Sequence, residues 1–319
     1  MTYGLTVIYD AQRLLRRSQA FILKRQVFYP MKISKILNTK QVTISFECFP
    51  PKTQAKYASV EEATEKVAAL KPDFLSVTYG AGGGTSEYTL NIAKNIRNKY
   101  GVDVLPHLTC VSSTKEKVHD MIRKYQEGGF ENIMALRGDI PEGGSPYHDY
   151  QYAYQLIRDI RENGGDFCIG GACYPEGHAE CAHKDEDIRH LKIKVDAGCD
   201  FLTTQMFFDN SIYYNFLYRI REAGITVPVL AGIMPITNPR QVQSAVKLSG
   251  TIMPARFISM VDRFGDNPQA MKQAGVIYAC EQSLDLISND CTHIHVYTMN
   301  KPDVAQMILE NLSHILGRA

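Results

Sequence analysis

The pair "VTISFECF" (residues 42–49) and "SVEEATEKVAALK" (59–71) opens the regular part of the sequence. The first segment is a short run of β-branched and apolar residues, which is typical of a buried strand. The second segment places apolar residues at helical spacing with charged residues between them. A strand that is apolar on both faces belongs to a parallel sheet covered by helices. The pair is therefore predicted to form one β/α unit.

The same pattern recurs about every 30 residues, the usual length of a β/α crossover unit. Glycines at 128–129, 164–165, 198 and 224 follow helix candidates and are typical of helix ends. Eight such units favour a closed (β/α)8 TIM barrel over an open sheet. The strand candidates are residues 42–49, 74–80, 103–110, 132–138, 167–175, 201–209, 227–235 and 293–300.

The spacing of the repeat breaks once, at residues 251–292, where extra helix precedes the last strand candidate. We expect this segment to pack outside the barrel or against a partner chain. Residues 1–30 are basic and weakly amphipathic, and they lack the small-residue cleavage site of a secretory signal. We interpret them as a non-catalytic N-terminal extension, and residues 31–319 as a single barrel domain.

Composition excludes several classes of protein. The 319 residues carry a net charge of +1, which predicts neither a nucleic-acid partner nor a membrane surface. Apolar runs are too short for a spanning helix. Eight scattered cysteines are typical of reduced thiols in a cytoplasmic protein rather than of a disulfide framework. Cys173, His178, Cys181 and His183 are zinc-ligand types, but their spacing matches no common zinc motif, so we predict no metal.

A barrel predicts where the functional residues lie, because sites in this fold form at the C-terminal ends of the strands. Nearly every strand candidate ends in polar or ionisable side chains, more than a purely structural barrel needs. We therefore predict a site at this end. These residues are Glu47, Thr78, Tyr79, His107, Thr109, Arg137, Asp139, Tyr174, Gln205, Asp209 and Tyr297.

Glu47 is an ionisable residue inside an apolar run. Burial disfavours a charged carboxylate, so a glutamate here is suited to act as a general acid near neutral pH. The alternative is a structural glutamate paired with a basic side chain, and Lys52 is the only basic residue nearby in sequence.

Other strand-end segments leave alternatives open. "ALRGD" (135–139) offers an arginine suited to a phosphate, or a local ion pair between Arg137 and Asp139. The amide of Gln205 needs partners, either in the next strand or in a ligand. His178 is either a ligand contact or a hydrogen-bonded loop histidine. "GAGGGT" (80–85) lacks the third glycine of a dinucleotide motif and is interpreted as a flexible βα loop.

Taken together, the segments resemble a known family, the bacterial-type, FAD-dependent methylenetetrahydrofolate reductases. They occur in order and cover the chain after Met31. The segments are "SFECFPPK" (45–52), "SVTYGAGGG" (76–84), "PHLTC" (106–110), "ALRGD" (135–139), "YPEGH" (174–178), "KVDAG" (194–198), "TQMFFD" (204–209), "GIMPITN" (232–238) and "YTMNK" (297–301).

The resemblance implies an FAD-binding (β/α)8 barrel that takes a hydride from NADH or NADPH and passes it to 5,10-methylenetetrahydrofolate. The product would be 5-methyltetrahydrofolate for one-carbon metabolism and methionine synthesis, made by ping-pong kinetics. Glu47 matches the acid that protonates the folate. Asp139 matches an aspartate that lies near the flavin, contacts the pterin and tunes the flavin potential.

The resemblance also implies binding roles for two sets of residues. Positions matching flavin contacts are Thr78, Tyr79, Ala81, His107, Arg137, Gly138, Asp139, Ala153, Tyr174, His178, Asp187, His190 and Lys194. Positions matching folate or nicotinamide contacts are Gln205, Gln241, Tyr297 and Lys301.

The chain departs from the family pattern in three places. Lys301 replaces an arginine, so a bidentate contact to the folate tail becomes a single point charge. His190 and Ile193 replace polar flavin contacts, and Ala245 replaces an aromatic residue that stacks on the nucleotide. The electron donor is therefore NADH, NADPH or a partner protein.

These departures leave an alternative function open. The chain would then be a flavin- and folate-binding subunit of a larger electron-transfer complex, fed by a partner protein. A homo-oligomer is left open as well. We expect no control by S-adenosylmethionine, because the regulatory domain of eukaryotic relatives does not fit in this length.

Overall fold

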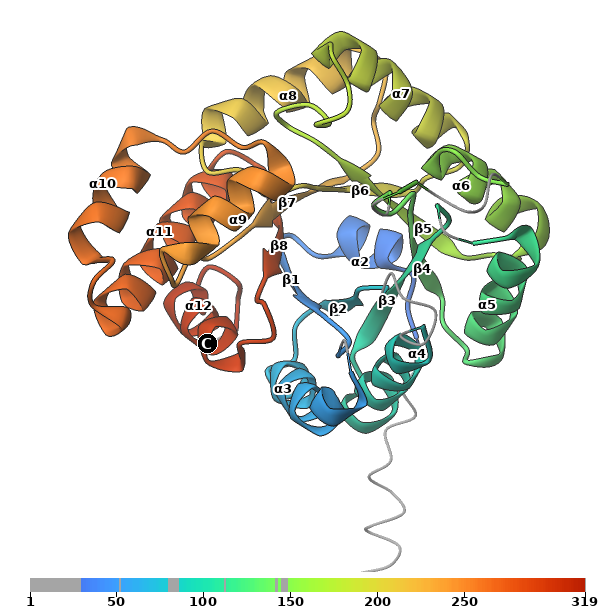
Figure 1. Cartoon of the computed structure of the whole chain (residues 1–319), viewed down its shortest axis with the longest axis horizontal. Coiled ribbons are helices and arrows are strands. Elements are labelled where there is room, and N and C mark those ends of the chain that lie inside the picture. The colour runs from blue at the N-terminus through green and yellow to red at the C-terminus, as the bar shows by residue number, and fades with distance from the viewer. Residues whose placement is uncertain are drawn as a thin grey trace, which may run out of the picture.

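Eight parallel strands form a closed barrel in chain order (Figure 1), which confirms the predicted (β/α)8 fold. The computed structural model describes residues 30–51, 53–79, 86–111, 113–140, 143–144 and 149–318. The strands are β1 (Thr43–Cys48), β2 (Phe74–Val77), β3 (Asp103–Thr109), β4 (Asn132–Leu136), β5 (Cys168–Cys173), β6 (Phe201–Thr204), β7 (Val229–Ile233) and β8 (His293–Tyr297).

The helices form a ring around this barrel, as the βα repeat predicts. Gly129 ends the predicted helix of residues 114–129 with a left-handed φ of 67°, a conformation that glycine adopts without strain. The ring and its additions comprise α3 (Tyr57–Ala69), α4 (Ser86–Asn95), α5 (Lys115–Glu127), α6 (Ala153–Asn163), α7 (Lys184–Asp196), α8 (Asn210–Glu222), α9 (Arg240–Ser249), α10 (Ala255–Phe264), α11 (Pro268–Ser288) and α12 (Pro302–Leu312).

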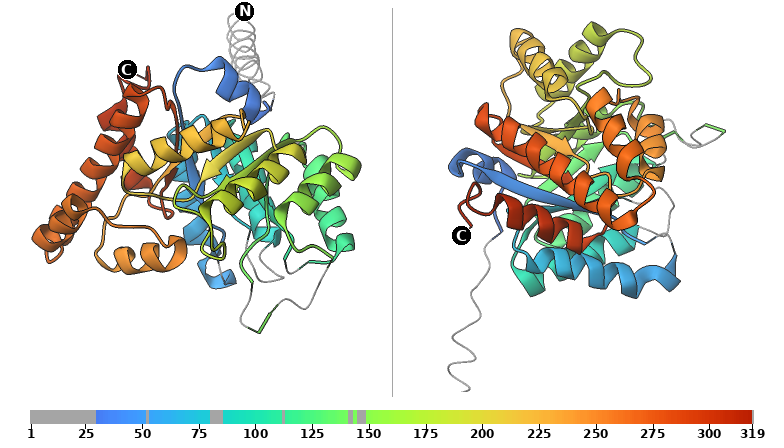
Figure 2. Two further views of the ribbon diagram at one scale, coloured as in Figure 1. Left: turned by 90° about the horizontal axis from the view of Figure 1, so that it is seen from above. Right: turned by 90° about the vertical axis from the view of Figure 1, so that its left-hand side faces the viewer.

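The insertion before the last strand has two parts that pack differently (Figures 1 and 2). Helix α11 contacts α8, α12 and β7, so it is a member of the ring. Helix α10 packs against α11 from outside and places Phe257 against Tyr278, with ring centroids 5.0 Å apart. The expectation that the whole segment lies outside the barrel is therefore wrong for α11, because its buried face is needed to cover β7.

Helix α11 also explains why β6 is shorter than predicted. The strand was expected to continue to residue 209, but it ends at Thr204. The side chains of Gln282 and Tyr278 on α11 donate hydrogen bonds to the carbonyl oxygens of Phe207 and Phe208, at 2.9 and 2.7 Å. These carbonyls therefore bond to a helix rather than to a neighbouring strand.

A short helix, α2 (Ile33–Thr39), closes the N-terminal end of the barrel, as the left view of Figure 2 shows. Its apolar residues Ile33, Ile36 and Leu37 are buried. They form one cluster with Phe74, Leu105, Met134, Cys168, Phe201 and Leu230 from inside the barrel. The side chain of Asn132 accepts from the Ile33 N–H at 2.7 Å and donates to the Met31 carbonyl at 3.1 Å. Residues 1–29 of the predicted extension lie outside the described residues.

Among the described helices, none is both long and apolar enough to cross a membrane.

Candidate active site

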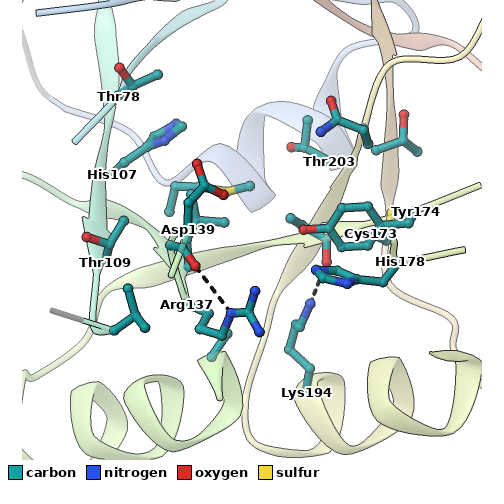
Figure 3. A pocket seen from close by; sticks show the side chains of 18 of the residues that line it. Thr78, His107, Thr109, Arg137, Asp139, Cys173, Tyr174, His178, Lys194 and Thr203 are labelled. Carbon is teal, nitrogen blue, oxygen red and sulfur yellow. Dashed lines mark hydrogen bonds between the residues drawn. The ribbon is translucent and has the colours of Figure 1, made fainter. Parts of the chain in front are cut away.

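A cavity of about 1350 Å³ opens at the C-terminal ends of the strands and reaches into the barrel (Figure 3). Typical small-molecule sites measure about 300–1,000 Å³, so this cavity has room for more than one ligand. The predicted residues that line it are Glu47, Thr78, Tyr79, His107, Thr109, Arg137, Gly138, Asp139, Ala153, Tyr174, His178, Asp187, His190, Lys194, Gln205, Gln241 and Tyr297.

Two predicted residues are placed elsewhere, and a third is not described. Ala81 belongs to the segment 80–85, outside the described residues. Asp209 caps α8, where its carboxylate accepts from the Ser211 N–H at 2.9 Å, so this strand-end residue serves the fold. Lys301 lies behind the cavity wall, and its Nζ donates to the Thr237 hydroxyl at 2.7 Å.

Glu47 lies near the end of β1 with its side chain inside the barrel, and only 8% of the residue is exposed. Its Oε2 is 3.7 Å from His107 Nε2 and 3.9 Å from His295 Nε2. Among the described residues, these two imidazoles are the basic side chains within 4.0 Å of it. Lys52, the basic partner considered from the sequence, lies outside the described part of the chain.

The two histidines beside Glu47 are held by serines on the inner face of the barrel. The Ser45 hydroxyl lies 2.7 Å from His295 Nδ1, and the Ser76 hydroxyl bonds to His107 Nε2. Burial lowers the pKa of His107 to about 4, so this imidazole is neutral near pH 7. Glu47 therefore faces a buried, polar surface whose nearest described groups are aligned by hydrogen bonds.

His295 was missed in the sequence, although a signal for it exists. In "HIHVY", residues 293, 295 and 297 alternate with apolar residues, so they share one face of the strand. Since Tyr297 was predicted to face the site, the same alternation places His295 on the inner face.

Positive charge gathers at another part of the cavity. The two terminal nitrogens of Arg137 bind the Glu180 carboxylate at 2.6 and 2.7 Å. The alternative of a local Arg137–Asp139 ion pair is therefore wrong, because the arginine reaches across to the β5–α7 loop. Lys194 is half-buried on α7 and donates to the Ala172 carbonyl at 2.6 Å. Burial lowers the pKa of this lysine.

The β5–α7 loop is fixed by its own contacts. The Tyr174 and His178 rings meet edge to face, with centroids 4.5 Å apart. The ring Nδ1 of His178 accepts from the backbone N–H of Glu180 at 3.1 Å. The backbone N–H of His178 donates to the Asp187 carboxylate at 3.3 Å. Burial lowers the pKa of His178 and raises that of Asp187. His178 is thus a hydrogen-bonded loop histidine that also lines the cavity.

The same loop carries the cysteine and histidine residues considered as zinc ligands. Within the part of the chain that the structure describes, no three His, Cys, Asp or Glu side chains are grouped so that they could hold a metal ion. The Cys181 thiol instead donates to the His183 carbonyl at 3.3 Å.

The opposite wall carries amide and phenol groups. Gln205 accepts from the Met206 N–H at 3.0 Å, so its carbonyl oxygen is bound within its own strand end rather than to the next strand. The Tyr297 hydroxyl donates to the Thr204 carbonyl at 2.5 Å. A Cβ at position 232 would lie 2.8 Å from the Tyr297 hydroxyl and 2.3 Å from the Thr204 carbonyl, so only glycine fits there.

Gln241 is held by the residue that binds Lys301. The N–H and hydroxyl of Thr237 donate to Gln241 Oε1 at 2.9 and 3.2 Å, while the hydroxyl accepts from Lys301. Burial lowers the pKa of Lys301. Lys301 is therefore one residue removed from the cavity surface, and its predicted contact with a substrate stays a prediction.

Comparison with known proteins agrees with the resemblance seen in the sequence. A family model described as methylenetetrahydrofolate reductase matches residues 32–313. The chain belongs to this family. The 5,10-methylenetetrahydrofolate reductase of Pectobacterium carotovorum is 35% identical over 273 residues, which cover 85% of this chain and 90% of that protein.

A second methylenetetrahydrofolate reductase relative is longer. Methylenetetrahydrofolate reductase 1 of Schizosaccharomyces pombe is 38% identical over 294 residues, and the match covers 88% of this chain but 48% of that protein. The chain thus spans about half the length of this relative. Among solved structures, an uncharacterized Clostridium thermocellum protein that binds two copies of 5-methyl-5,6,7,8-tetrahydrofolic acid shares the fold, with a TM-score of 0.67 and 15% identity over 91% of this chain and all of that one.

Three of the four positions where the chain departs from the reductase pattern line the cavity. His190 and Ile193 both line the cavity from α7, and Ile193 is 41% exposed. Ala245 lines it from α9 and is fully buried. At these positions the cavity wall has an aliphatic side chain at 193 and a buried alanine at 245.

A flavin dinucleotide fits three features of the site. The cavity volume exceeds that of an ordinary substrate pocket. Arg137 and Lys194 provide positive charge suited to phosphates. The Thr203 hydroxyl is a buried polar atom in the cavity wall without a hydrogen-bond partner in the described structure. A bound group with phosphates and a polar ring would meet all three.

Proposed function

We propose that this chain reduces 5,10-methylenetetrahydrofolate to 5-methyltetrahydrofolate with electrons from a nicotinamide nucleotide, through bound FAD. The observation that carries this proposal is Glu47, a carboxyl buried in the cavity between two imidazoles. Membership of the reductase family and the size of the cavity support it. FAD, when bound, would supply the chemistry of hydride transfer between the nucleotide and the folate.

Glu47 is the acid in this reaction. The folate carries its methylene carbon between two nitrogens, and the carbon is released from one of them when that nitrogen is protonated. Glu47 gives this proton, and the freed carbon then accepts the hydride. Overall, the folate gains a hydride and a proton, and the nucleotide is oxidised. Neutral His107 lies beside the carboxyl without adding a positive charge, and His295 lies 3.9 Å from the same oxygen.

The remaining residues bind and orient. Arg137 and Lys194 would hold the phosphates of FAD, once Glu180 yields the terminal nitrogens of Arg137. Asp139 follows directly on Gly138 at the end of β4 and would place a negative charge near the ring, which opposes charge build-up on it. Gln205, Gln241 and Tyr297 would meet the folate and the nicotinamide, which use the same cavity in turn.

The visible absorption spectrum of the full chain tests this proposal. The purified chain is reconstituted with FAD and then treated anaerobically with NADH or with NADPH. We expect a flavin spectrum that bleaches with at least one nucleotide and returns when methylenetetrahydrofolate is added. The nucleotide that bleaches it names the donor.

Two other outcomes would change the proposal. A flavin spectrum that neither nucleotide bleaches would favour the alternative of a flavin- and folate-binding subunit fed by a partner protein. The altered cavity wall at His190, Ile193 and Ala245 is the observation that keeps this alternative in view. A chain that cannot be reconstituted with FAD would overturn both.

A further inference from the structure

Thr203 lies on β6 with its side chain on the inner face of the barrel, and 5% of the residue is exposed. Figure 3 shows it on the wall of the cavity that faces Thr78 and His107. Its hydroxyl oxygen is one of two buried side-chain polar atoms without a hydrogen-bond partner in the described chain. Buried hydroxyls are normally paired, so this one needs an explanation.

The neighbouring residue on β6, Thr204, shows that a threonine hydroxyl on this strand can find a hydrogen-bond partner within the chain. The Thr204 hydroxyl accepts from the Gly232 N–H at 2.8 Å, and its carbonyl accepts from the Tyr297 hydroxyl at 2.5 Å. Thr204 therefore serves the fold. Thr203 pairs in register with Ala172 on β5 and Leu230 on β7, and neither side chain offers it a polar atom.

We propose that the Thr203 hydroxyl is a binding group for the flavin ring, to which it gives a hydrogen bond from the wall of the cavity. This inference rests on the proposed function. A hydroxyl left unpaired in the free chain costs free energy, and a ligand that supplies a polar atom removes that cost on binding. Thr203 is thus a specificity residue for the group that occupies the deep part of the cavity.

The position of Thr203 favours the flavin over the folate. Leu105 and Met134, which line the deep end of the cavity, also belong to the cluster under α2. Gln205 follows the end of β6, two residues nearer the mouth than Thr203, and Gln241 lies on α9 beyond β7. The flavin is the ligand that stays bound through turnover, so it is the group that would keep this buried hydroxyl paired.

The test compares three variants of the full chain, each measured for melting temperature without ligand and for FAD affinity by fluorescence titration. Thr203→Val removes the hydroxyl and keeps the shape. Thr203→Ser keeps the hydroxyl. Thr43→Val is the matched control, because Thr43 is buried on β1 far from the cavity and its hydroxyl lies 3.0 Å from His293 Nδ1.

We expect Thr203→Val to bind FAD about threefold to tenfold more weakly, the loss typical of one neutral hydrogen bond. Its melting temperature without FAD should not fall, since no hydrogen bond within the free chain is broken. Thr203→Ser should retain the affinity of the wild type. Thr43→Val should melt earlier and bind FAD as the wild type does.

Two results would overturn this inference. One is that Thr203→Val changes neither the FAD affinity nor the binding of methylenetetrahydrofolate. The other is that Thr203→Val leaves the FAD affinity unchanged but weakens the binding of methylenetetrahydrofolate, which would assign the hydroxyl to the substrate. A wild-type chain that binds no FAD would instead overturn the proposed function itself, so the two failures are distinguishable.

Discussion

The two ends of the barrel are built from the same eight strands but are finished in opposite ways. At the N-terminal end, α2 buries Ile33, Ile36 and Leu37 against the barrel interior, and Asn132 pairs with the backbone of residues 31 and 33. At the C-terminal end, a cavity of about 1350 Å³ separates the polar side chains. One end is a packed core, and the other keeps polar groups for a ligand.

The difference shows how one scaffold separates stability from chemistry. Changes at the closed end should lower the free energy of unfolding and leave the site alone, because its polar groups are already paired within the chain. Changes at the open end should alter binding or catalysis with little effect on folding. Substitutions at either end of the barrel therefore test whether stability and ligand binding are separate.

The largest effect is expected for Glu47→Gln at the open end. Glutamine keeps the size of the side chain but has no acidic proton to give to the folate. We expect the rate of folate reduction to fall about 10²- to 10⁴-fold, the usual contribution of a general acid. Reduction of the flavin by the nucleotide should persist. Stopped-flow absorbance measures the two half-reactions separately.

The control for this variant is Glu62→Gln, which changes an exposed glutamate on α3 that pairs only with Lys66 among the described residues. It should reduce folate at the wild-type rate. Full folate reduction by Glu47→Gln would show that the buried carboxyl is structural and that another group supplies the proton.

At the closed end, Ile33→Ala should lower the free energy of unfolding by about 2–5 kcal/mol. Ile33 is fully buried under the barrel, so the change leaves a cavity that its neighbours cannot fill. FAD affinity below the melting temperature should not change. Urea denaturation and flavin titration measure the two quantities, and Lys35→Ala on the exposed face of α2 is the control.

A weakened FAD affinity in the stably folded Ile33→Ala chain would contradict the separation of the two ends. It would mean that the cluster under α2 supports the floor of the cavity as well as the fold. Leu105 and Met134 are the residues through which this would act, because they belong to both.

The closed barrel was predicted from the sequence, and most of the predicted site residues line the cavity, for a physical reason. Each strand is buried on both faces, so it appears in the sequence as a continuous apolar run. A polar residue at the C-terminal end of such a strand lies at the open end of the barrel, where the cavity is. What the prediction missed depends on contacts between distant segments. The Glu180 partner of Arg137 and the missing partner of Thr203 are examples. The end of β6 is another, since side chains on α11 take its next carbonyls.

The next prediction concerns Arg137 and its competitor for phosphate. Arg137→Met should weaken FAD binding about 10- to 100-fold, the loss typical of a hydrogen bond to a charged group. Glu180→Gln should bind FAD at least as tightly as the wild type, because the carboxylate that occupies both terminal nitrogens is gone. Fluorescence titration measures both affinities. Weaker binding by Glu180→Gln would show that Glu180 positions the arginine rather than competing with the ligand.

The smallest effect is a pH dependence at the closed end. Asp103 begins β3 and accepts from the Met31 N–H at 2.7 Å, and burial raises its pKa to about 6. An unfolded aspartate loses its proton near pH 3.9. Between about pH 4 and pH 6, only the unfolded chain therefore releases this proton, so stability falls as the pH rises.

Asp103→Asn is the matched variant, because its side chain has no proton to release in this range. The melting temperature of the wild type minus that of Asp103→Asn should decrease from pH 4 to pH 6 and level off above it. A difference that stays constant across this range would show that Asp103 is charged in the folded chain and that its bond to Met31 outweighs burial.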